Sequence, residues 1–232
     1  MILSVSYLES ILSHGRSDGW DYVDLTGCRE EFVIIMVKIA KLVTQHQMAE
    51  RNEWLSFDMT PVEEVEGVLR DFVIIPPSYD SNVSEEELNM ALDRYHCDEA
   101  WRNGLILYIT RVFRWQSRDH DGPSYVGFLA RNIINHARSI RKEATYQKQI
   151  LIPMFLAGAE ARNEEEMDFL RKYCGWWSRS CGFKQFDDVR RYLEEIWREK
   201  GLLDMENIWW GTVIERARAR AESPLRPEIL LG

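Results

Sequence analysis

The stretch from Ile150 to Ala161 most constrains the fold, because it is apolar except for Glu160 and yet contains Pro153. It is shorter than the ~18 residues that a membrane span requires, so it predicts a buried helical segment instead. Proline removes a backbone donor, so Pro153 should either kink a helix over residues 145–161 or mark its true start. An acidic helix start follows at once, with Asn163 as the expected N-cap of Glu164–Glu166.

Helical periodicity runs through nearly the whole chain. Val33, Met36, Val37 and Ala40, for example, recur at spacings of three and four, which gives one buried stripe. The β signals are weak, since the run Val73–Ile75 is stopped by two prolines. We predict an all-α fold, a single compact bundle of about eight to ten helices forming one domain over residues 1–232. The expected helices cover about residues 2–13, a stretch after Gly27, 61–72, 84–115, a stretch from Pro123, 145–161, a helix ended by Gly182, another ended by Gly201, and a last one from about Asn207.

Local signals fix several expected helix ends. Thr60 is the expected N-cap of the helix over 61–72, with Pro61 in its first turn. Ser84 and Glu87 form a capping box, which opens a long helix with a break expected near Gly104.

Composition excludes several classes of function. The chain has 29 Lys and Arg against 38 Asp and Glu, a net charge of -9, so we expect no direct binding of nucleic acid. Its four cysteines form no Cys-x-x-Cys pair, which predicts reduced thiols and no metal site. Residues 1–10 lack the pattern of a signal peptide, and we expect a soluble protein with no membrane contact.

Catalytic motifs are missing from the sequence. There is no phosphate-binding glycine loop, no nucleophile elbow and no His-Glu-x-x-His pattern, so we assign no catalytic residue. Asp93 and His96 lie one turn apart, but di-iron bundles need two such pairs with further glutamates. We therefore interpret this pair as a solvated helix face.

Large aromatic side chains are the more informative feature. An all-α domain can use them as ordinary core or to enclose an apolar ligand between helices. Ala157 and Gly158 permit either close helix approach or room for a ligand, and the sequence does not separate these interpretations. The candidate residues for an effector pocket are Trp101, Tyr108, Phe155 and Trp177.

The order of these segments resembles the regulatory domain of fungal zinc-cluster transcription factors, including the sterol-responsive regulators. The resemblance is carried by the run 150–161, the acidic start at 163–166, and the closing Leu193-Glu-Glu-Ile-Trp197. Residues 100–113 and the turn Leu25-Thr-Gly-Cys28 also resemble family features. Ala159 and Met167 depart from the pattern, and four scattered cysteines cannot build the six-cysteine zinc cluster.

The resemblance implies a non-enzymatic module that controls transcription in the nucleus, with shuttling to the cytoplasm left open. It implies a homodimer, a small apolar effector and transcriptional coactivators as partners. DNA contact, and with it any zinc cofactor, would come only from a DNA-binding module missing from this chain. The four pocket candidates are chosen on physical grounds, since no family motif marks them. Two alternatives stay open: a ligand-free scaffold for dimerisation and coactivator docking, and an all-α enzyme acting on a hydrophobic metabolite.

Overall fold

The computed structural model describes residues 5–14, 27–78, 83–114, 124–203 and 208–220, and within these ranges it contains ten helices and no strand. The predicted all-α class is therefore confirmed. The helices are α1 (Val5–His14), α3 (Glu30–Arg51), α4 (Thr60–Asp71), α5 (Glu85–Phe113), α6 (Ser124–Ser139), α7 (Thr145–Gln149), α8 (Leu151–Glu160), α9 (Glu164–Cys181), α10 (Lys184–Leu203) and α11 (Trp210–Arg220).

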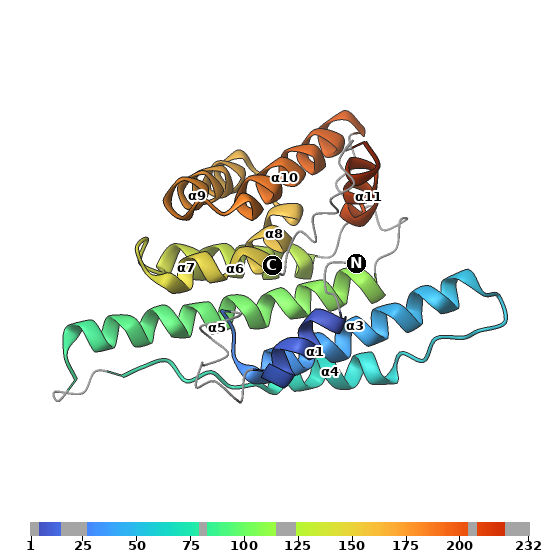
Figure 1. Ribbon diagram of the computed structural model, residues 1–232, viewed down its shortest axis with the longest axis horizontal. Coiled ribbons are helices and arrows are strands. Elements are labelled where there is room, and N and C mark those ends of the chain that lie inside the picture. Colours follow the sequence, from blue (N-terminus) through green and yellow to red (C-terminus); the bar gives the residue numbers. More distant parts are fainter. Residues whose placement is uncertain (1–4, 15–26, 79–82, 115–123, 204–207, 221–232) are drawn as a thin grey trace.

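The helices are arranged around the long helix α5, which runs along the molecule (Figure 1). Helices α1, α3 and α4 lie on one side of α5, and α6, α7 and α8 lie on the other. Helices α9 and α10 pack on each other and on α8, and α11 packs against α10. In the described parts of the chain, no helix combines the length and the apolar character that crossing a membrane requires.

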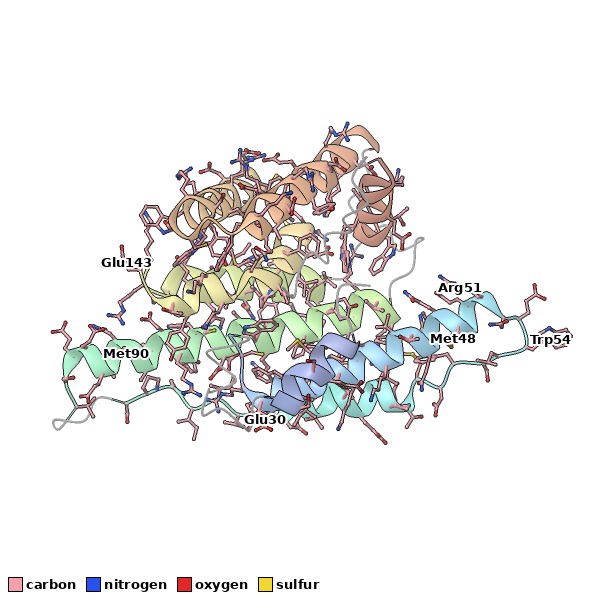
Figure 2. The ribbon with its side chains drawn as sticks, viewed as in Figure 1. Glu30, Met48, Arg51, Trp54, Met90 and Glu143 are labelled. Atoms are coloured by element: carbon pink, nitrogen blue, oxygen red, sulfur yellow. The ribbon has the colours of Figure 1, made fainter. Side chains whose placement is uncertain are left out.

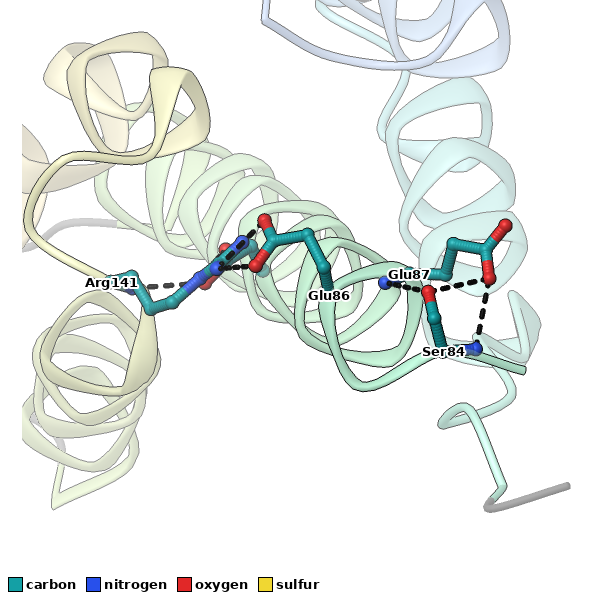
Figure 3. Close-up of polar contacts among 5 residues, drawn as sticks. Ser84, Glu86, Glu87 and Arg141 are labelled. Atoms are coloured by element: carbon teal, nitrogen blue, oxygen red, sulfur yellow. Dashed lines mark hydrogen bonds and ion pairs between the residues drawn. The ribbon is translucent and has the colours of Figure 1, made fainter. Parts of the chain in front are cut away.

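Helix α5 begins with the predicted capping box. The Ser84 Oγ accepts from the backbone N of Glu87 at 3.3 Å, and Glu87 Oε2 accepts from the backbone N of Ser84 at 2.9 Å (Figure 3). The break expected near Gly104 is wrong, because α5 continues to Phe113. A Cβ on Gly104 would lie 3.3 Å from the Cα and Cβ of Pro153, so this glycine permits the close approach of α8.

Pro153 marks a helix start. The expected single helix over 145–161 is instead two helices, α7 and α8, joined at Ile150. Pro153 is the third residue of α8, within the first turn, where a missing N–H costs no intrahelical hydrogen bond. The break at Ile150 therefore precedes the proline, as its missing donor requires.

Gly158 allows three helices to meet. A Cβ at this position would lie 2.9 Å from both methyl carbons of Leu193 and 3.0 Å from Leu170 Cδ1, which come from α10 and α9. The indole Nε1 of Trp197 also donates to the Gly158 carbonyl at 2.8 Å. Of the two interpretations of this small residue, close helix approach is the one that the packing shows.

Two other helix ends differ from expectation. Thr60 is not the N-cap of α4 but its first residue, and Asp58 Oδ1 accepts from its backbone N at 2.9 Å. Gly201 does not stop α10, which continues to Leu203, because an exposed glycine in a last turn costs only about 1 kcal/mol. Asn163 and Gly182 do end α9 as predicted, with Gly182 in the left-handed conformation at φ 69°.

The turn before α3 contacts both α5 and the end of α7. Gly27 has φ 75°, and its carbonyl accepts a hydrogen bond from Cys97 Sγ of α5 at 3.2 Å. A Cβ on Gly27 would lie 2.2 Å from the Cβ of Gln149, at the end of α7. Glycine is therefore required here both by the backbone conformation and by the contact.

Candidate functional site

Two of the predicted pocket residues, Tyr108 and Phe155, meet around a third ring, Trp210. The Trp210 ring centroid lies 5.7 Å from that of Phe155, edge to face, and 6.3 Å from that of Tyr108. The three come from α8, α11 and α5, and each side chain is buried. Burial raises the pKa of the Tyr108 hydroxyl above its ordinary value, so this phenol stays neutral. We call Tyr108, Phe155 and Trp210 the aromatic cluster.

Trp101 lies on the same helix as Tyr108, two turns earlier, and its side chain is buried. Trp177 belongs to a separate group of contacts: its ring stacks on Phe186 at 6.3 Å, and its Nε1 donates to Gln147 Oε1 at 3.2 Å. The structure thus brings two of the four candidates into contact and places Trp177 elsewhere. That all four line one pocket stays a prediction.

Two buried indole N–H groups have no hydrogen-bond acceptor among the described residues, Trp101 Nε1 and Trp210 Nε1. A buried donor left without a partner costs about 1–3 kcal/mol, and such groups are rare enough in native proteins to require an explanation. An acceptor supplied by a ligand would satisfy either of them.

A buried ion pair connects the aromatic cluster to the rest of the core. Arg111 Nε lies 2.6 Å from Glu160 Oε1, and the two side chains are only 3% and 7% exposed. The Nη2 of Arg111 also donates to the carbonyl of Ile208 at 3.2 Å. Ile208 precedes Trp210 by two residues, so this arginine fixes the point at which the chain enters α11.

Helix α11 is also held through its neighbours. Trp209 and Trp210 lie with ring centroids 4.5 Å apart, and a Cβ on Gly211 would lie 2.5 Å from Trp209 Nε1. Arg216 Nη2 pairs with Glu199 Oε2 of α10 at 2.9 Å. Sequence reasoning did not name Trp210 or Arg111 as site residues. The Trp209-Trp210 pair at the start of the last helix was the available signal.

Asp93 and His96 do not form the solvated face that we expected. Asp93 is 2% exposed, and its carboxylate accepts from the backbone N and Nε of Arg141 at 2.9 and 2.7 Å. Figure 3 shows Arg141 reaching the start of α5, where it also pairs with Glu86. His96 Nδ1 lies 2.9 Å from His136 Nδ1 of α6. Asp93 therefore joins α5 to the turn after α6, and His96 contributes to the packing of α5 against α6.

The described residues hold no group of three or more His, Cys, Asp or Glu side chains suited to a metal ion. Burial raises the pKa of the Cys97 thiol well above its ordinary value and that of Cys174 to about 12. Thiols of this kind are poor nucleophiles at neutral pH, because the thiolate is the reactive form. The surroundings of the Cys97 and Cys174 thiols are those of a packed core.

A sequence profile described as "Fungal specific transcription factor domain" matches residues 2–221 of the chain. No curated protein and no solved structure matches the chain at a significant level.

Proposed function

The chain belongs to the family of fungal-specific transcription factor domains, and from this premise we propose that it is a regulatory domain gated by a small apolar effector. Its role in regulating transcription follows from the family. The effector, its binding place at the aromatic cluster and the action of residues 1–232 as one domain are our proposal. The same premise favours a binding role over catalysis.

The observation that carries the proposal is the orphaned N–H of Trp210 at the centre of the aromatic cluster. An apolar molecule with one acceptor oxygen would satisfy this donor. This contact would remove a cost of about 1–3 kcal/mol that the present packing carries. The effector is therefore expected to be mostly hydrocarbon, with a single hydroxyl or carbonyl.

Gating requires two packings of the helices with different affinities for the effector. Helix α11 is the element best suited to differ between them, since it lies at the edge of the bundle beside α10 (Figure 1). Displacing Trp210 would also disturb the bond from Arg111 to the carbonyl of Ile208. Occupancy of the cluster would thereby be communicated to α5 and α8.

A reporter assay tests this proposal. The domain is fused to an unrelated DNA-binding module and an activator, and reporter output is compared for wild type, Trp210→Phe, Trp210→Ala and Trp54→Ala. Trp54 is the matched control, because it is 96% exposed and lies in the connection between α3 and α4, close to the end of α3 (Figure 2). We expect both Trp210 variants to change the output and Trp54→Ala to leave it unchanged.

The Trp210→Phe variant keeps a ring in the cluster and guards against simple unfolding, which circular dichroism would reveal. Equal output from folded Trp210→Phe, Trp210→Ala and wild type would contradict a gating role for the cluster.

A second candidate is a ligand-free scaffold for dimerisation and coactivator docking. It is favoured by apolar side chains exposed on α4 and the segment after it, Val68 at 55%, Val73 at 80% and Ile75 at 81%. Light scattering on wild type and on Val73→Ser/Ile75→Ser tests it. A wild-type dimer that becomes a monomer in the variant would support the scaffold, and a monomer in both would exclude dimerisation through this surface.

In either case we propose that the domain acts in the nucleus, and we leave open whether it shuttles between nucleus and cytoplasm. We also propose that DNA is contacted by a separate zinc-cluster module, since this chain carries a net charge of -9.

A further inference from the structure

A pocket of about 700 Å³ lies between the end of α6, the turn into α7, and α9. Its volume is in the range of sites that take small molecules, about 300–1,000 Å³. It lies apart from the aromatic cluster, and none of Tyr108, Phe155 and Trp210 lines it. Nothing in the family assignment accounts for this pocket.

The charge of the pocket is opposite to that of the chain. Its lining includes five cationic side chains and no carboxylate, although the chain as a whole carries -9: Arg138, Arg141, Lys142, Lys172 and Arg179. Cations gathered in a concave site with low-dielectric walls raise the local concentration of anions.

Two of these cations are available to a ligand. Arg141 is committed to Asp93 and Glu86. Lys142 and Arg179 have no ion pair with any carboxylate in the described residues. A carboxylate, sulfonate or phosphate in the pocket would therefore gain two charge-assisted contacts without breaking an ion pair.

The remaining two cations pair weakly. Arg138 pairs at 2.9 Å with Glu165, which is 80% exposed, and Lys172 pairs with Asp168 one turn away on α9. Exposed pairs of this kind contribute little, so both side chains can turn toward a ligand.

The walls between the cations are aromatic. The Lys142 Nζ lies 3.6 Å from the centroid of the Trp176 ring, and the Arg138 guanidinium lies 5.0 Å from that of Phe169. Tyr173 completes the wall and is held in place because its hydroxyl donates to the Gln147 carbonyl at 2.8 Å. The rings form the apolar part of the lining, with Lys142 over one face of Trp176 and Arg138 over one face of Phe169.

We infer that this pocket binds a small anion with a flat apolar body, held by Lys142 and Arg179 beside Trp176. A flat ligand would pack beside the rings while its acidic group meets the two cations that have no ion pair among the described residues. A nucleic acid fits less well, because the remainder of this acidic chain repels an extended polyanion. The site would act independently of the effector at the aromatic cluster.

The probes for the test are anilinonaphthalene sulfonate and phenylnaphthylamine, which share the aromatic body and differ in the sulfonate. Fluorescence titrations are run on wild type, Lys142→Gln/Arg179→Gln, Arg51→Gln/Arg198→Gln and Lys38→Gln. Arg51 and Arg198 are the matched charge control, since both are exposed and lie on α3 and α10 (Figure 2 labels Arg51). Lys38 lines a separate groove between α3 and α4.

We expect wild type to bind the sulfonate with one-to-one stoichiometry and at least about tenfold tighter than the uncharged amine. The Lys142→Gln/Arg179→Gln variant should lose that advantage, and Arg51→Gln/Arg198→Gln should keep it. Equal affinity for both probes, or loss in Lys38→Gln instead, would overturn the inference. Displacement of the sulfonate by an acidic peptide that binds tighter than the dye would also overturn it, in favour of a protein partner.

Discussion

Arg111 of α5 and Glu160 of α8 form an ion pair of 2.6 Å, with side chains that are 3% and 7% exposed. The pair joins the long central helix to the helix that begins at the break before Pro153. Both charges are removed from water, so each one is tolerated in the core only because the other is there. Either charge alone would be an uncompensated buried charge.

Glu160→Gln should therefore destabilise the fold by about 3–5 kcal/mol, since Arg111 would stay charged without its partner. Urea denaturation measures the change in the free energy of unfolding. Arg111→Met/Glu160→Met, which removes both charges, should recover most of the loss. A single variant that loses less than about 1 kcal/mol would show that the pair is not desolvated as described.

Gly158→Ala should lower the free energy of unfolding by about 1–3 kcal/mol, because the new methyl group would overlap Leu193 and Leu170. Gly67→Ala in α4 is the matched control, since nothing lies within 4 Å of a Cβ there. That change should stabilise the protein by about 0.5–1 kcal/mol. If both substitutions stabilised the protein in thermal unfolding, the close packing at Gly158 would be wrong.

Alanine substitutions at the two glycines with positive φ distinguish the cost of backbone strain from the cost of a steric contact. Gly182→Ala has open space around it and should cost about 1–2 kcal/mol for the left-handed conformation alone. Gly27→Ala has the same conformational cost and also meets Gln149, so it should cost clearly more. Equal losses in chemical denaturation would contradict the contact between the Gly27 turn and α7.

Acid should weaken the contact between α5 and α6 at His96 and His136. Burial lowers the pKa of both below the ordinary 6.5, and for His136 the charge of His96 lowers it further. Asp93 and Glu99 act in the opposite direction on His96, while Arg102 lowers the pKa of His136. The unfolded chain then binds more protons than the folded one, so stability is present above pH 6.5 and falls as pH is lowered through it.

The measurement is the free energy of unfolding at pH 7.5 and 5.5 for wild type and His136→Asn. The wild type should lose more stability than the variant, which has one titrating ring fewer. Comparing the two chains cancels the contribution of Asp98, whose pKa burial raises and whose effect therefore has the opposite sign. An equal loss of stability in the two chains between pH 7.5 and 5.5 would exclude the histidine pair as the cause of the acid effect.

Local signals correctly predicted several helix ends that depend on neighbouring residues, although Thr60 and Gly201 were assigned the wrong role. Ser84 with Glu87, Asn163 and Gly182 act within one turn, and each was found where the sequence indicated it. Gly104 was misread as a break because its role depends on Pro153, far along the chain. A glycine at a helix crossing and a glycine at a helix end look alike in sequence.

Long-range pairs had no local signal at all. Asp93 pairs with Arg141 across 48 positions, and His96 meets His136 across 40, so spacing alone suggested only a solvated helix face. Two of the three residues of the aromatic cluster, Tyr108 and Phe155, were named from the sequence for their size. Their common partner Trp210 was not, because its position depends on how α11 folds back.

The central claim is that a small apolar effector binds at the aromatic cluster. Native mass spectrometry of the purified wild type, before and after organic extraction, tests it most directly, with Trp210→Phe measured in parallel. The account predicts a bound molecule of defined mass that solvent releases, and a changed occupancy in the variant. A clean apo mass for wild type, unchanged when fungal lipid extract is added, would contradict the account and favour the ligand-free scaffold.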